Sequence, residues 1–110
     1  LPIGRACITA RVQQGQAERL ILHPRDHGCH AADVEWSDET TWTEQALAAL
    51  DNRGPLLDAL RWNAGAYLWF SGLSDSLESG LQTADGVLKT GQALQCLDQL
   101  RSWRSHLSIR

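Results

Sequence analysis

The sequence predicts an α+β chain in which a β-hairpin and an irregular loop precede four helices. Three observations predict this class. Residues 6–12 alternate in polarity, residues 24–40 follow neither a strand nor a helix period, and from Thr41 onward apolar residues recur every three or four positions. We find no internal repeat, low-complexity tract or Gly/Ser linker, so residues 1–110 are predicted to form one domain.

The hairpin is predicted over residues 6–23. Its first strand, ACITARV, places Ile8, Ala10 and Val12 on one face and Cys7, Thr9 and Arg11 on the other, which is typical of a half-buried strand. Gly15 predicts a short turn. The second strand ends at Pro24, because proline has no N–H for a strand ladder. Residues 24–40 are rich in turn formers and are predicted to be an ordered loop.

The helices are predicted between residues 41 and 107. Thr41 and Glu44 have the spacing of a capping box, which starts the first helix. Gly54 is predicted to end that helix in a left-handed conformation, and Pro55 suits the first turn of the next one. The second helix contains RWNAGAYLWFSG, which is apolar nearly all round, so we expect it to be buried on nearly all sides.

Two further amphipathic helices follow Gly72. Asp75, with Glu78 three residues later, is an acidic capping signature for the third helix. Thr90 and Gly91 interrupt its apolar pattern, after which the fourth helix begins.

Charge, cysteine content and the longest apolar run limit the classes of function. A net charge of −3 argues against nucleic-acid binding through bulk charge alone. The longest apolar run is shorter than the roughly 20 residues that cross a bilayer, so no membrane partner is expected. Cys7, Cys29 and Cys96 form no CxxC motif, which favours reduced thiols and a cytoplasmic location. Because the chain starts at Leu1 rather than Met, we expect a longer parent protein.

Asn63 is an amide inside the most apolar helix. A buried amide costs stability unless its donors and acceptor are bonded, so we expect it to reach a backbone group of a neighbouring segment or to face a cavity. Ala64 and Gly65 beside it fit a position where a second backbone approaches closely. Asn63 is therefore interpreted as structural.

Three groups of residues are candidates for chemical sites. The first is HPRDHGCH, which holds His23, Asp26, His27, Cys29 and His30 and suggests either zinc or a Cys–His nucleophile. Its spacing matches no standard zinc pattern, so a polar turn is preferred. The acids Asp75 and Glu78 are interpreted as helix-start charges. The basic tail, containing Arg101, Trp103, Arg104 and Arg110, fits either a solvated helix end or a contact with phosphates and bases. No catalytic, cofactor-binding or metal-binding residue is therefore assigned.

An ordered set of motifs carries a resemblance to a known family. The motifs are Asn63-Ala64-Gly65, Ser76-Leu77-Glu78-Ser79-Gly80 and Thr90-Gly91-Gln92-Ala93, preceded by the Pro24 to Gly28 turn. In this order they resemble the closing helices of anthranilate phosphoribosyltransferases and cover most of residues 17 to 101. No single motif is diagnostic, but the ordered set is moderately specific.

The resemblance implies a C-terminal part of an α/β domain of the nucleoside-phosphorylase and phosphoribosyltransferase type. The parent would be a transferase of tryptophan biosynthesis that uses phosphoribosyl diphosphate and magnesium. The family's glycine-rich diphosphate loop and Asp-Glu metal pair precede the matched part, so residues 1–110 would be non-catalytic alone. The implied partner is the rest of the parent chain, and a homodimer is a further expectation.

Two features depart from the family's pattern. The opening LPIGR stands where the enzymes have a Ser- or Thr-rich stretch, and the segment around Asn63 is unusually rich in tryptophan. Both resemble the anthranilate-phosphoribosyltransferase-like paralogues, some of which bind nucleic acid. The alternative function is therefore a non-catalytic paralogue that binds nucleic acid.

Overall fold

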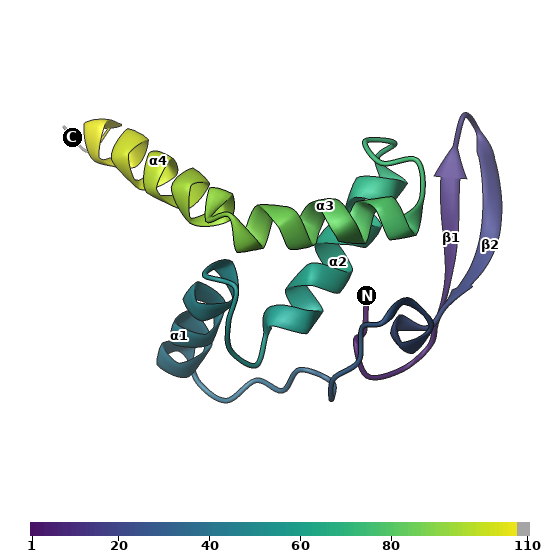
Figure 1. Ribbon diagram of the computed structural model, residues 1–110, viewed down its shortest axis with the longest axis horizontal. Coiled ribbons are helices and arrows are strands. Elements are labelled where there is room, and N and C mark those ends of the chain that lie inside the picture. Colours follow the sequence, from purple (N-terminus) through teal and green to yellow (C-terminus); the bar gives the residue numbers. More distant parts are fainter. Residues whose placement is uncertain (108–110) are drawn as a thin grey trace.

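A computed structural model, which describes residues 1–107, contains a two-stranded hairpin and four α-helices. The elements in chain order are β1 (Cys7–Gln13), β2 (Gln16–Leu22), a 3-10 helix (Pro24–His27), α1 (Glu39–Leu50), α2 (Leu57–Phe70), α3 (Leu77–Lys89) and α4 (Gln92–Leu107). The predicted fold class is confirmed. In Figure 1, α2 and α3 cross at the centre, and the hairpin lies on the side opposite to α1 and α4.

The backbone angles of the hairpin turn account for the residues found there. Gln13 pairs with Gln16, which leaves Gln14 and Gly15 as a two-residue turn with φ angles of 51° and 76°. Positive φ at both positions matches the twist of the flanking strands. The half-buried face of β1 is not its apolar face. Cys7, Thr9 and Arg11 are half-buried, whereas Ile8 and Val12 are exposed.

Two predicted helix starts are wrong in position. Asp38 caps α1, because its carboxylate accepts hydrogen bonds from the Thr41 N–H at 2.8 Å and from the Thr41 hydroxyl at 2.9 Å. These hydrogen bonds lower the pKa of Asp38, since they favour its charged form. At α3, Ser76 rather than Asp75 is the cap, and its hydroxyl accepts from the Ser79 N–H at 3.1 Å.

The connection between α1 and α2 also differs from the prediction. Asn52, with φ of 59°, takes the first left-handed position after α1, although Gly54 is left-handed as predicted, with φ of 87°. Asparagine tolerates this conformation better than most residues. Helix α2 begins at Leu57, so Pro55 lies in the preceding turn rather than in the helix.

The core lies where α2 crosses α3. Trp62 and Ala66 of α2 pack with Leu77 and Leu81 of α3, and Ile3, Leu22 and Cys29 complete the cluster. The helices approach closely at two glycines, since a Cβ atom placed on Gly80 would lie 2.2 Å from the carbonyl oxygen of Gly65. The close approach predicted at Gly65 is therefore confirmed.

The expectation that α2 is buried on nearly all sides is wrong. Only Trp62, Gly65 and Ala66 of this helix are buried, and Tyr67 is 59% exposed. The other apolar side of α2 borders an open groove, and no described element covers that groove. Among residues 1–107, no helix is long and apolar enough to cross a membrane.

Candidate functional site

The Asn63 side chain joins α2 to the start of the chain. Its Nδ2 donates to the Leu1 carbonyl at 2.9 Å and to the Ala59 carbonyl at 3.0 Å, and its Oδ1 accepts from the Leu1 nitrogen at 2.5 Å. Both of its polar atoms are therefore bonded. The expected contact with the backbone of a neighbouring segment is confirmed, and it gives Asn63 a structural role.

The histidines of HPRDHGCH point to different partners. His23 Nδ1 accepts from the Arg25 N–H at 3.3 Å and thereby caps the 3-10 helix, while His30 is exposed. His27 Nδ1 lies 3.0 Å from Glu78 Oε1, and its ring stacks on Trp62 with centroids 5.8 Å apart. The segment is a polar turn that fixes the loop to α2 and α3.

Cys29 lies in a polar cluster that sequence inspection missed. Cys29 is 2% exposed, and its sulfur accepts a hydrogen bond from Arg61 Nη2 at 3.7 Å. Arg61 also lies 3.3 Å from a carboxylate oxygen of Asp58 and 3.7 Å from one of Asp85, and Lys89 contacts Asp85 at 2.7 Å. These acids already face cations, and Cys29 is buried, so the cluster links α2 to α3 and to the loop.

A small cavity borders this cluster. Its volume is about 180 Å³, and it is lined in part by His27, Cys29, Arg61 and Asp85. No sequence signal marked Arg61 or Asp85, because their proximity depends on the crossing of two helices rather than on local spacing.

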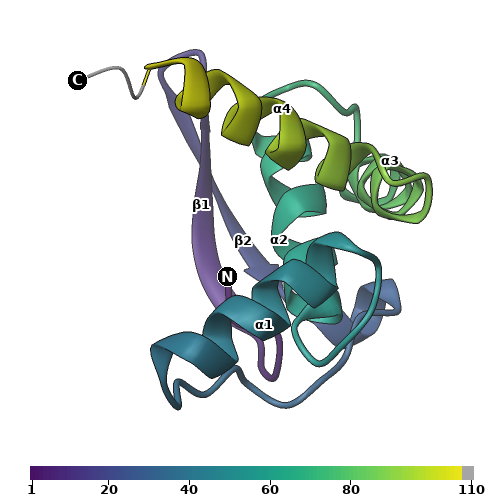
Figure 2. The same cartoon turned by 90° about the vertical axis from the view of Figure 1, so that its left-hand side faces the viewer.

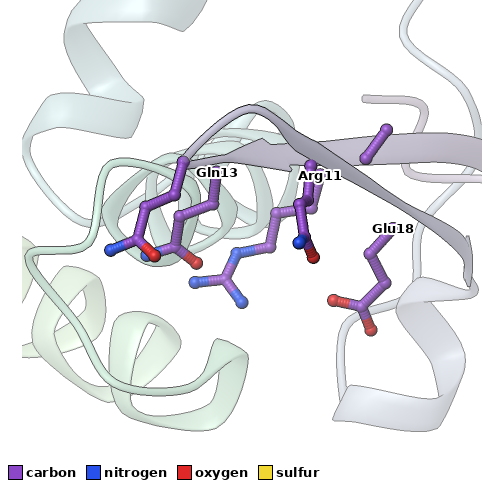
Figure 3. A pocket seen from close by; sticks show the side chains of 6 residues that line it. Arg11, Gln13 and Glu18 are labelled. Carbon is purple, nitrogen blue, oxygen red and sulfur yellow. The ribbon is translucent and has the colours of Figure 1, made fainter.

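A polar pocket lies beside the hairpin turn. Figure 3 shows Arg11, Gln13 and Glu18 extending from the same side of the hairpin. The pocket measures about 270 Å³, and the Arg11 guanidinium stacks on Trp69 at 4.7 Å from the ring centroid. Within residues 1–107, Arg11 Nε is buried without a hydrogen-bond partner. The surrounding side chains are exposed amides and one acid, so the pocket is a polar surface without a nucleophile.

The other predicted candidates lie apart from these features. Asp75 is exposed and caps no helix, whereas Glu78 lies in the first turn of α3, as predicted. Arg101, Trp103 and Arg104 are exposed on α4, and Arg101 pairs with Asp98 at 3.7 Å. Arg110 lies outside the described residues.

Metal-ligating side chains do not gather within the part of the chain that the structure describes: no group of three or more His, Cys, Asp or Glu side chains there is arranged to hold an ion.

Comparison with known proteins finds anthranilate phosphoribosyltransferases among the similar sequences. The chain is 33% identical over 102 residues to an anthranilate phosphoribosyltransferase of Xanthomonas campestris pv. campestris, a match that covers 89% of this chain and 30% of the relative. It is 35% identical over 97 residues to the anthranilate phosphoribosyltransferase of Laribacter hongkongensis, which covers 84% of this chain and 28% of that relative. No family model matches the chain.

The resemblance to anthranilate phosphoribosyltransferases that the motifs predict is therefore confirmed in sequence. The chain spans about 30% of the length of the curated relatives it matches. The matched motifs have structural positions here: Asn63 fixes the Leu1 backbone, Ser76 caps α3, and Gly65 meets Gly80 at the helix crossing.

Proposed function

We propose that residues 1–110 are the C-terminal scaffold segment of an anthranilate phosphoribosyltransferase-like protein. The parent would transfer a phosphoribosyl group from phosphoribosyl diphosphate to an aromatic amine. The observation that carries this proposal is the extent of the match, which includes 89% of this chain but 30% of the Xanthomonas campestris relative.

The contacts of the matched residues support a scaffold role. Trp62 and Gly65 lie in the α2–α3 core, and Asn63 bonds both of its polar atoms to the backbone. Substitution of such residues would change the activity of the parent indirectly, because other parts of the parent would be displaced. The role proposed for this segment is to support a catalytic site, not to supply its reacting groups.

Magnesium and phosphoribosyl diphosphate would bind elsewhere in the parent. Mg²⁺ takes oxygen ligands from carboxylates and phosphates. Within residues 1–107, the acids nearest the core are already paired: Asp58 and Asp85 with Arg61, and Glu78 with His27. This donor set does not fit a magnesium site, and we assign no reaction step to it.

The test is calorimetric titration of the longer gene product with phosphoribosyl diphosphate, with and without magnesium. Single-stranded DNA is titrated in parallel at two salt concentrations. Magnesium-dependent binding of the sugar diphosphate without DNA binding is the expected result. Salt-sensitive DNA binding without sugar-diphosphate binding would contradict the transferase proposal and favour a nucleic-acid-binding paralogue.

A further inference from the structure

The chain exposes more surface than a self-contained domain of its mass. Its accessible surface is 7758 Å² for 12.2 kDa. Folded monomers of that mass expose about 6,100 Å², so the excess is about 1,700 Å². The radius of gyration agrees, since it is 15.8 Å where about 13 Å is usual for 110 residues.

Much of the apolar exposure lies on the helices. A groove of about 500 Å³ is lined by Leu50 of α1, by Leu60, Tyr67 and Leu68 of α2, and by Val87 and Leu88 of α3. Among residues 1–107, no charged side chain lines this groove. Interfaces that form permanently resemble a domain core in this respect, whereas the patches of transient partners carry more polar groups.

Helix α4 extends this apolar surface. It has no buried residue, and Leu100, Trp103 and Leu107 are each exposed by at least 55%. Leu100 and Leu107 are seven residues apart and therefore share a helical face, with Trp103 near its edge. In Figures 1 and 2, α1 and α4 lie on the same side of the molecule, and α4 extends beyond the end of α3.

The size and spread of the exposed surface favour a large occupant. A standard interface removes about 800 Å² from each partner, which is about half of the excess. The exposed apolar residues also include Ile8, Val12 and Ile21 on the hairpin, at the end of the molecule away from α4. A two-fold contact with a second copy uses one patch per chain, so it would leave one of these ends uncovered.

We propose that the helical groove and the apolar face of α4 bind the remainder of a longer polypeptide, as a permanent interface within one folded chain. This inference rests on the proposed function. In the Xanthomonas campestris relative, the part outside the match is more than twice as long as the matched part. The occupant presents an apolar face, since the groove offers no charged partner.

The test uses the longer gene product and hydrogen exchange measured by mass spectrometry. We expect the amides of α4 to exchange as slowly as those of α2, at a rate that does not depend on protein concentration. Replacing Leu100 with aspartate should accelerate exchange across α4 by at least about tenfold and lower the melting temperature. Gln95→Asp is the matched control, because Gln95 is exposed on the same helix away from the apolar face.

Two results would overturn the inference. Rapid exchange across α4 in the unsubstituted protein would show that nothing covers the helix. Protection that rises with protein concentration, together with a dimer in light scattering that Leu100→Asp dissociates, would identify a second copy as the occupant. Neither readout requires activity, so α4 protection in a protein that binds no phosphoribosyl diphosphate would reject the proposed function alone.

Discussion

Helices α3 and α4 are consecutive in the chain and similar in length, yet their burial differs completely. Helix α3 buries five residues, namely Leu77, Gly80, Leu81, Ala84 and Leu88, whereas α4 buries none. Both helices carry apolar residues at helical spacing. The difference is that α3 crosses α2 within the described chain, while α4 extends past it. A periodic pattern thus predicts that a helix has an apolar face, but not where the partner of that face lies.

The largest effect expected on the core side of this comparison comes from Trp62→Ala. Trp62 is 1% exposed and carries the His27 stack, so its removal leaves a large cavity between α2 and α3. We expect a loss of about 3–5 kcal/mol in the free energy of unfolding, measured by urea denaturation.

Trp103→Ala is the matched control for Trp62→Ala, because Trp103 is 60% exposed on α4. In the 110-residue chain its effect should be within about 0.5 kcal/mol. Equal losses at Trp62 and Trp103 would mean that α4 packs against the core, contrary to the structure.

The helix crossing provides the second prediction. In Gly80→Ala the new Cβ would lie 2.2 Å from the Gly65 carbonyl oxygen, so the two helices must move apart. We expect a loss of about 1–3 kcal/mol in the free energy of unfolding, as for other overpacked cores. Gly86→Ala on the same helix meets no atom of residues 1–107 within 4 Å and should raise stability by up to about 1 kcal/mol. If both variants lost stability equally, the close approach would not be the cause.

Asn63→Leu tests the link between the core and the start of the chain. The substitution leaves the Leu1 and Ala59 carbonyls without the donor that Asn63 supplies. Because a partly buried acceptor loses its partner, the melting temperature should fall, with a loss of about 1–2 kcal/mol in the free energy of unfolding. An unchanged melting temperature in differential scanning calorimetry would contradict a structural role for Asn63.

Local sequence signals predicted the secondary-structure elements and the structural roles of several residues. The hairpin turn, the four helices, the left-handed glycines and the backbone contact of Asn63 each follow from rules that span a few residues. The errors at Asp38 and Ser76 have a common cause. In each case a second polar residue nearby has acceptable spacing, Thr41 three positions after Asp38 and Asp75 directly before Ser76. Only the backbone angles, which are extended at both true caps, decide between the candidates.

Features that depend on long-range packing were not predictable. Arg61 meets Cys29 and Asp85, residues that are 32 and 24 positions away, and no local pattern marks this cluster. The inward face of β1 was equally hidden. Alternation shows that a strand has two faces, but it does not show that the half-buried face is the one with Thr9 and Arg11, where the Arg11 guanidinium stacks on Trp69 of α2.

The smallest expected effect is Leu100→Asp in the 110-residue chain. Leu100 is 56% exposed on a helix with no buried residue, so the substitution removes little packing and should change the free energy of unfolding by less than about 0.5 kcal/mol. Urea denaturation of the 110-residue chain and of the longer gene product, each with and without the substitution, measures the difference. A large loss of unfolding free energy in the longer product alone would show that a surface outside these residues covers α4. A large loss in the short chain would mean that α4 folds back onto the groove, and the contrast between α3 and α4 would then disappear.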